Sequence, residues 1–303
     1  MSRAAIDIGS NSLLLTILDD AGAIVVDEAQ VVGLGRGLGD RGLFASDRIA
    51  HAEEVLAEYV KAAAEHGVSA GSIRAVATSG ARRAMNAQTW FARLQKSLGL
   101  RIRTITGDEE ARLSWLGARR DLDLPEGPLL VVDIGGGSTE LVLGEGDRIF
   151  GRASLEIGSV RLTEAYLGVG HVDPSGLAKL RNHVDSQVAS VKLEPAPRTV
   201  IGVAGTVTTL GAMALGLEQY SSAEVHGGKL TRVELARFID RLLPASPAER
   251  RQIAAVSPDR ADYLLAGATI LDRVLQSSRR PQLTVSDRGL RFGLLADTTP
   301  VAG

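Results

Sequence analysis

The sequence predicts an α/β protein made of two related domains, because one strand-turn-strand unit occurs in it twice. Residues 4–18 read AAIDIGSNSLLLTIL, and residues 130–143 read LVVDIGGGSTELVL. In each copy an apolar strand ends at an Asp, a tight Gly/Ser turn follows, and a second apolar strand leads into a polar hairpin turn. A single Asp-Ile-Gly is a weak signal, but two copies with matching flanks indicate a duplicated phosphate-loop domain.

Apolar periodicity and turn residues predict the elements in order. Strands are expected at 4–8, 12–18, 22–27, 73–78, 102–105, 129–133, 139–143, 148–155 and 282–286, with a strand-turn-helix at 199–216. Helices are expected from Ser46, the predicted N-cap of a long amphipathic helix, and at 87–97, 108–116, 160–166, 174–190, 232–243, 248–254 and 260–275.

Pro125 and Gly127 interrupt the chain just before the second copy. We therefore place the domains at 1–124 and 125–303 and expect a mixed five-stranded sheet in each. The sequence leaves open whether the final helix, after residue 291, packs on the first domain.

Composition excludes several classes of protein. With 303 residues, 45% of them apolar and 23% charged, the chain has enough apolar side chains for a packed core. A net charge of −2 gives no general attraction to nucleic acid or to an anionic membrane, so a polyanion would need a local basic cluster. The chain has no cysteine, which excludes disulfides and thiolate metal sites.

Location is predicted from two further features. The N-terminus enters a strand without a signal region. The uncharged stretch 199–217 approaches the length of a membrane span, but its glycines and threonines favour a soluble core. We expect a cytoplasmic protein that binds neither nucleic acid nor membrane, and the sequence leaves a homodimer open.

The two turns predict phosphate binding, because glycines let the backbone approach an anion closely and consecutive N–H groups then form an anion-binding concavity. If the two turns face each other across a cleft between the domains, they would grip a phosphate chain, with Asp7 and Asp133 holding a cation. The turn residues are Gly9, Ser10, Asn11 and Ser12 in the first copy, and Gly135, Gly136, Gly137 and Ser138 in the second.

Four further clusters follow predicted strands. Arg82 lies in the first and offers a planar fork to phosphate oxygens. The second, residues 106–113, carries three acids in a first helical turn, one of which would make a general base for water. Gly205 and Thr206 lie in the third, a strand-turn-helix with donors for an anion. Arg288 and Arg291 lie in the fourth, at the end of the last strand.

Together these clusters resemble the exopolyphosphatase / guanosine pentaphosphate phosphohydrolase (Ppx/GppA) family, in the short two-domain form, of the actin-like ATPase superfamily. The resemblance spans nearly the whole chain. It rests on DIGSNS (7–12), TSGARRAMN (78–86), GDEEARL (107–113), DIGGGSTE (133–140), GSVRL (158–162), AGTVTT (204–209), VHG (225–227) and SDRGLR (286–291).

The resemblance implies two actin-like (ribonuclease H-like) domains with an interdomain cleft, and it implies roles for single residues. The second Glu of the pair, Glu110, is the implied base, and the implied phosphate-binding arginine is Arg82, not Arg83. Asp133 and Glu140 are the implied metal ligands, for Mg²⁺ or another divalent cation. Arg36, Arg288 and Arg291 would lead the rest of a phosphate chain outward.

Two departures from the family pattern affect the expected substrate. Gly33 stands where many members carry a basic residue, so one contact is missing or is supplied by Arg36. The helical C-terminal domains of larger members are absent from the sequence. We therefore expect hydrolysis of the terminal phosphate of inorganic polyphosphate, with short chains favoured.

Three alternatives compete with this expectation. The first is hydrolysis of guanosine pentaphosphate, which would tie the protein to the stringent response. It is disfavoured because only 4% of residues are aromatic and no motif carries a platform for the base. The second is an actin-superfamily kinase or ATPase. The third is a catalytically silent sensor, but a sensor would be expected to have lost Glu110 or Asp133, and both are present.

Overall fold

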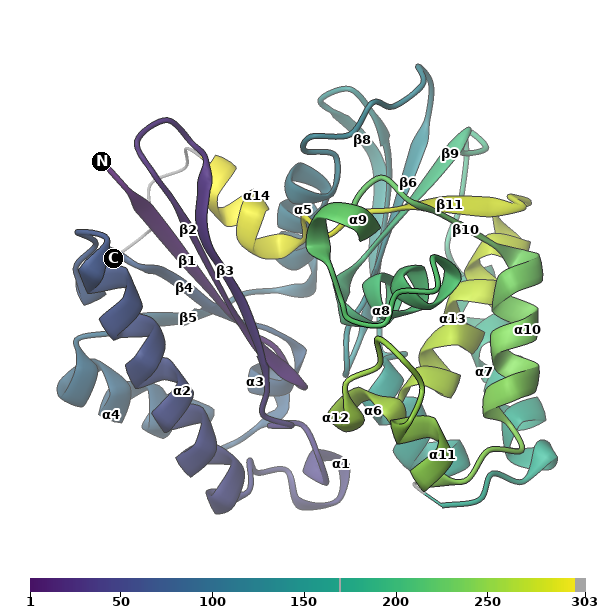
Figure 1. Ribbon diagram of the computed structural model, residues 1–303, viewed down its shortest axis with the longest axis horizontal. Helices are drawn as coiled ribbons and strands as arrows, with labels where there is room; N and C mark the ends of the chain where they lie inside the picture. Colours follow the sequence, from purple (N-terminus) through teal and green to yellow (C-terminus); the bar gives the residue numbers. More distant parts are fainter. Residues whose placement is uncertain (169, 298–303) are drawn as a thin grey trace. The chain divides into compact units, whose positions relative to one another are not determined.

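The computed structural model describes residues 1–168 and 170–297, apart from the side chains of Asp40 and Arg41. These residues form two compact units (Figure 1). The first contains residues 1–117 and the chain from Leu290 onward, and the second is Ala118–Gly289. Pro125 and Gly127 predicted a division near residue 124. In the structure the segment after Ala118 belongs to the second unit, where the Arg119 guanidinium donates to the carbonyl of Gly146.

The first unit is built on a mixed sheet of five strands, as predicted. The order of these strands in the sheet is β3-β2-β1-β4-β5. β1 pairs antiparallel with β2 and parallel with β4, which in turn runs parallel to β5. The strands are β1 (Arg3–Ile8), β2 (Ser12–Leu18), β3 (Ile24–Val31), β4 (Arg74–Ala77) and β5 (Ile102–Thr104).

Helices of the first unit follow the predicted pattern, with two short additions, α1 and α3. The long helix α2 buries the predicted apolar stripe and contacts β2, where the Tyr59 hydroxyl donates to the carbonyl of Leu13. Ser46 is its first residue and not its N-cap, which is Ala45. The helices are α1 (Leu38–Arg41), α2 (Ser46–Glu65), the 3₁₀ turn Ala70–Ser72, α3 (Ser79–Arg83), α4 (Ala87–Leu98), α5 (Gly107–Ala118) and α14 (Leu290–Ala296).

The final helix, α14, packs against β1 and β2 of the first unit. Its apolar residues Leu290, Leu294 and Leu295 join a small core with side chains of β1, β2, β4 and α5. The Arg3 guanidinium donates to the carbonyl of Leu295 at 2.8 Å, and the Arg74 guanidinium donates to the carbonyl of Leu294 at 2.7 Å. These two bonds satisfy carbonyls at the end of the helix.

Gly293 allows this packing, because a Cβ at that position would lie 1.9 Å from the carbonyl oxygen of Leu113 on α5. Gly293→Ala is expected to destabilise the protein by about 1–3 kcal/mol, since a backbone atom cannot turn away as a side chain can. Thermal unfolding of the two proteins checks this. Gly289→Ala is the control, because a Cβ there meets no heavy atom within 4 Å. Equal melting temperatures for the two variants would contradict the close packing.

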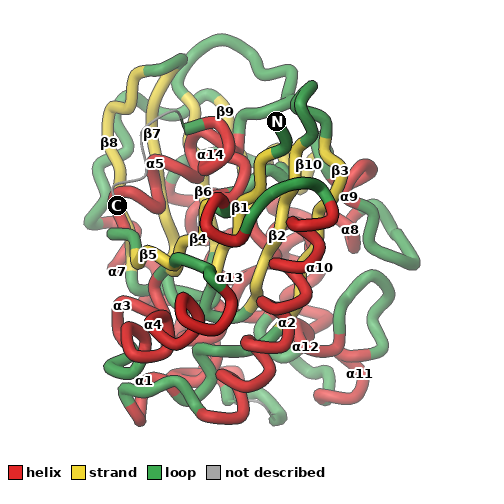
Figure 2. Tube along the Cα trace, turned by 90° about the vertical axis from the view of Figure 1, so that its left-hand side faces the viewer, coloured by secondary structure: helices red, strands yellow, loops and turns green. Residues whose placement is uncertain are grey.

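The second unit repeats the first sheet and adds a strand. Its strands β6, β7 and β8 are among those drawn in yellow in Figure 2. Its order is β10-β11-β9-β6-β7-β8, in which β8-β7-β6-β9-β11 corresponds to β3-β2-β1-β4-β5. The prediction of five strands was wrong here, because the three-residue strand β10 is too short to show periodicity. The strands are β6 (Leu129–Ile134), β7 (Thr139–Glu145), β8 (Arg148–Leu155), β9 (Thr199–Val203), β10 (Lys229–Thr231) and β11 (Gln282–Val285).

Helix α13 buries ten of its 14 residues and contacts α7 and α10. The helix expected at 260–275 is divided, because α12 ends at Ala261 and α13 begins at Leu264. The helices are α6 (Ser159–Leu162), the π-helical turn Thr163–Leu167, α7 (Pro174–Ala189), α8 (Ala204–Ala214), α9 (Ser222–Val225), α10 (Arg232–Leu242), α11 (Pro247–Arg251), α12 (Pro258–Ala261) and α13 (Leu264–Ser277).

The uncharged stretch 199–217 forms β9 and α8, as the strand-turn-helix prediction required. Within residues 1–168 and 170–297, no helix combines the length and the apolar character that crossing a membrane demands.

Candidate functional site

The first phosphate loop joins β1 to β2. The Gly9 N–H donates to the carbonyl of Ser12 at 3.0 Å, and a Cβ on Gly9 would lie 3.0 Å from that oxygen, so the turn is as tight as a glycine allows. Asp7 is the second-last residue of β1, paired with Leu14 of β2 and Val76 of β4. The loop thus lies at the carboxyl end of β1, beside that of β4, where ligands of open α/β sheets bind.

The glycine-rich loop at 33–42 is hydrogen-bonded to this phosphate loop. Gly35 N–H donates to the carbonyl of Ser10 at 2.6 Å, and the N–H groups of Val32 and Gly33 donate to the carbonyl of Asn11 at 3.0 and 2.8 Å. A Cβ on Gly35 would lie 3.0 Å from the Cβ of Ser10. Because the carbonyl oxygens of Ser10 and Asn11 accept these hydrogen bonds, they would repel an anion bound at the loop less strongly.

The predicted base and the predicted phosphate-binding arginine touch each other in the first unit. Nη1 of Arg82 donates to Oε2 of Glu110 at 2.7 Å and to the carbonyl of Ile105 at 3.1 Å. Glu110 is 7% exposed. The pair connects α3, which follows β4, to α5, which follows β5.

Burial distinguishes the three acids that begin α5. Asp108 is exposed. Glu109 is half-buried and forms a bidentate pair with Arg103, at 2.7 and 2.6 Å. Only Glu110 is buried, next to an arginine that can also bind phosphate. Burial therefore distinguishes Glu110 from Asp108 and Glu109, which their positions in the sequence alone did not.

The second phosphate loop repeats the first. Gly135 N–H donates to the carbonyl of Ser138 at 3.0 Å, as Gly9 does to Ser12. Here residues of α6 donate hydrogen bonds to the carbonyls of the loop. The Ser159 N–H donates to the carbonyl of Gly135, and the Arg161 N–H donates to that of Gly136. The Arg161 guanidinium donates to the carbonyl of Gly137 at 2.8 Å.

Asp133 and Glu140 face each other across the ladder of β6 and β7. Directly opposed residues project to the same face of a sheet, with Cβ atoms about 4.5–5.5 Å apart. Both carboxylates are buried, and Oε1 of Glu140 accepts from the Ser154 hydroxyl at 2.7 Å.

This carboxylate pair fits a divalent cation. Two buried like charges repel, and Mg²⁺ is commonly held by one or two carboxylates together with substrate phosphates. The part of the chain that the structure describes contains no cluster of three or more His, Cys, Asp or Glu residues suited to a metal. A cation here would thus complete its shell with substrate and water. Asp7, the third predicted ligand, lies in the first unit.

The third predicted phosphate turn, Gly205 and Thr206, begins α8 and is covered by Arg260 of α12. Nη1 of Arg260 lies 3.4 Å from the carbonyl oxygen of Gly205 and 3.5 Å from Oγ1 of Thr209. A Cβ on Gly205 would lie 2.7 Å from the guanidinium carbon. Arg260 was missed, since Pro258 signals a helix start but nothing local connects the arginine to a turn 55 residues away.

The three arginines assigned to chain binding all have contacts within their own unit. Arg36 lies against Gly33, where a Cβ would be 2.6 Å from its Nε. Nε of Arg288 lies 3.8 Å from Asp121. Arg291 is buried and forms a 2.8 Å ion pair with Asp27. Their role in chain binding stays a prediction.

A polar network that sequence reasoning did not anticipate surrounds Asp287. The hydroxyls of Tyr220 and Ser222 donate to its carboxylate, and its N–H donates to Nδ1 of His226 at 3.2 Å. Burial, assisted by Arg288, lowers the pKa of His226. Burial and the Asp287 charge raise the pKa of Tyr220, so its phenol stays protonated as a donor.

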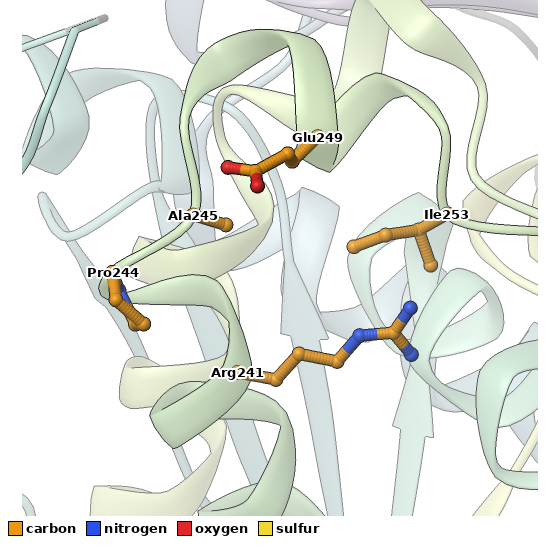
Figure 3. Close-up of a pocket in the computed structure, with 5 residues that line it drawn as sticks. All are labelled: Arg241, Pro244, Ala245, Glu249 and Ile253. Atoms are coloured by element: carbon orange, nitrogen blue, oxygen red, sulfur yellow. The ribbon is translucent and has the colours of Figure 1, made fainter.

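A pocket of about 370 Å³ lies in the second unit (Figure 3). Arg241, Pro244, Ala245, Glu249 and Ile253 line it. Glu249 is engaged in capping α11, where its Oε2 accepts from Ser246 N–H at 2.7 Å. None of these residues belongs to a phosphate motif.

A duplicated α/β fold with a Gly/Ser turn after the first strand of each sheet, a buried Glu–Arg pair and a carboxylate pair is the arrangement predicted for an enzyme that processes phosphate compounds. The Ppx/GppA phosphatase family matches residues 17–301, and the chain belongs to this family.

Similar proteins agree with this assignment. Exopolyphosphatase 2 of Mycobacterium tuberculosis is 36% identical over 96% of both chains. The crystal structure of the Aquifex aeolicus member of the Ppx/GppA family has 34% identity and a TM-score of 0.82, over 97% of this chain and 96% of that one. The crystal structure of an exopolyphosphatase from Cytophaga hutchinsonii has 26% identity and a TM-score of 0.87, over 98% of this chain and 97% of that one. The predicted family, fold class and enzymatic nature are thereby confirmed.

Proposed function

We propose that this enzyme is an exopolyphosphatase, which releases the terminal phosphate of inorganic polyphosphate by metal-assisted in-line attack of water. The observation that carries the proposal is the contact between Arg82 and the buried Glu110. It joins a phosphate-binding cation to a carboxylate that can accept a proton, which hydrolysis requires at one place.

In this mechanism the turns 9–12 and 135–138 bind the terminal phosphate through the N–H groups of residues 10–12 and 136–138, because those of Gly9 and Gly135 donate within the turns. Arg82 holds its equatorial oxygens and orients Glu110. Because Oε2 of Glu110 already accepts from Arg82, we assign the proton of the attacking water to Oε1. Gly205 and Thr206 supply further donors at the start of α8.

Asp133 and Glu140, with Asp7 as a further acid, are proposed to hold Mg²⁺ or another divalent cation. Such an ion, when bound, would neutralise charge that develops on the phosphate oxygens. Ser154 fixes Glu140 by donating to Oε1, so the carboxylate is oriented before the ion arrives.

Short chains are the proposed substrates. Arg291 is paired with Asp27, and Arg288 lies near Asp121 and Asp287, so neither guanidinium is held solely for a long polymer. One observation favours guanosine pentaphosphate as the second candidate: the aromatic residue Tyr220 is 43% exposed, while its hydroxyl donates to Asp287.

Phosphate release from short-chain polyphosphate, guanosine pentaphosphate and ATP tests the proposal. We expect the highest kcat/KM with polyphosphate. Higher kcat/KM with guanosine pentaphosphate would transfer the assignment to the nucleotide. Transfer of phosphate from ATP to an acceptor, or binding without release, would support a kinase or a sensor instead.

Asp133→Asn is expected to raise the Mg²⁺ concentration needed for half-maximal activity by at least tenfold, about the effect of weakening a metal shell. Activity titrated with Mg²⁺, and calorimetry of Mg²⁺ binding, check this. Asp147→Asn is the control, since its fully exposed carboxylate lies in the β7–β8 turn of the same unit. An unchanged Mg²⁺ requirement in Asp133→Asn would remove this residue from the proposed metal site.

A further inference from the structure

Arg82 and Arg83 are neighbours on α3, but their side chains diverge. Arg82 reaches Glu110 and the carbonyl of Ile105. Arg83 lies over the glycine-rich loop: a Cβ on Gly39 would be 3.9 Å from Nη2 of Arg83. The two guanidiniums therefore serve different parts of the first unit.

Among the described residues, Arg83 differs from the other arginines of the motifs in having no anionic partner. Arg82 pairs with Glu110, Arg161 with Glu156 and Arg291 with Asp27. Within the described part of the chain, Arg83 forms neither an ion pair nor a side-chain hydrogen bond. It is half-buried, so its charge has lost part of its hydration, and no residue whose side chain is described supplies a counter-ion.

The surroundings of Arg83 belong to the first phosphate loop. Gly80, at the start of α3, packs on Ser10, whose Oγ would lie 3.0 Å from a Cβ at Gly80. Arg83 is three residues further on, about 4.5 Å along the helix axis. Gly35, in the loop that Arg83 covers, donates to the carbonyl of Ser10. Arg83 thus lies one helical turn beyond the loop that would hold the terminal phosphate.

We propose that Arg83 binds the phosphates that follow the terminal one, and that it sets affinity for the chain without taking part in bond cleavage. This inference rests on the proposed polyphosphatase function. Arg36, which lies against Gly33, stays predicted to contact the chain, and Arg83 would be a further contact. A guanidinium is suited to the contact, because it binds two oxygens of a phosphate at once.

Steady-state hydrolysis of tripolyphosphate and of a longer short-chain polyphosphate by Arg83→Gln tests the proposal. We expect KM for the longer chain to rise about tenfold, as for the loss of one charge-assisted contact, with kcat within about twofold of wild type. The increase should be smaller for tripolyphosphate. The salt dependence of KM should weaken, which a purely structural role would not cause.

Arg101→Gln is the matched control. Arg101 is exposed and precedes β5, so it lies at the edge of the parallel strands opposite to the phosphate loop. Arg83→Lys should recover most of the lost affinity, and melting temperatures should show that the variants are folded.

The outcomes separate this inference from the proposed function. If wild type hydrolyses polyphosphate and Arg83→Gln has the KM of Arg101→Gln, the role of Arg83 is refuted and the function stands. A fall in kcat at unchanged KM would also refute it. If wild type releases no phosphate from polyphosphate, the proposed function fails, and the role of Arg83 fails with it.

Discussion

Glu110→Gln is expected to stop hydrolysis while polyphosphate binding survives. The amide keeps the shape of the side chain and can still accept from Arg82, but it cannot take a proton from water. The loss should appear in kcat and should be about 10²–10⁴-fold, the usual contribution of a general base. Phosphate release and an independent binding measurement check the two parts.

Glu109→Gln is the matched control for this variant. Glu109 lies in the same helical turn, but its carboxylate is half-buried and held by Arg103. Its loss should change kcat by no more than a few-fold. Turnover of Glu110→Gln close to that of Glu109→Gln would mean that Glu110 only stabilises the helix start and that the base lies elsewhere.

Gly158→Ala is expected to disrupt the second phosphate loop. A Cβ at this position would lie 2.4 Å from backbone atoms of Gly136 and Gly137, far inside van der Waals contact. The loop must move, because neither partner is a side chain that can rotate away. We expect at least a hundredfold loss of kcat/KM, about the cost of removing one preorganised donor, and destabilisation by about 1–3 kcal/mol.

Gly151→Ala provides the comparison, since a Cβ on this residue of β8 would meet no heavy atom within 4 Å. It should retain activity, apart from a small effect of the added side chain on the strand. Activity within a few-fold of wild type for Gly158→Ala, with an unchanged melting temperature, would show that the loop tolerates displacement and that its N–H groups contribute little.

Short motifs account for what could be predicted about the candidate site. Gly9 to Ser12 and Gly135 to Ser138 form their turns within four residues, so the local sequence encodes both. The resemblance selected Glu110 from three adjacent acids, and burial now separates it from the other two. Arg260 could not be predicted, because its contact with Gly205 depends on how α12 packs against α8.

The sequence by itself determined the two Gly/Ser turns, the positions of the main strands along the chain and the duplication of the strand-turn-strand unit. These features depend mainly on alternation and turn chemistry among neighbouring residues. The tertiary structure alone decided that β10 extends the second sheet, that α14 packs on the first unit, and that Arg82 reaches Glu110, 28 residues away. Such contacts depend on which surfaces the core brings together, and packing, unlike periodicity, leaves no local pattern in the chain.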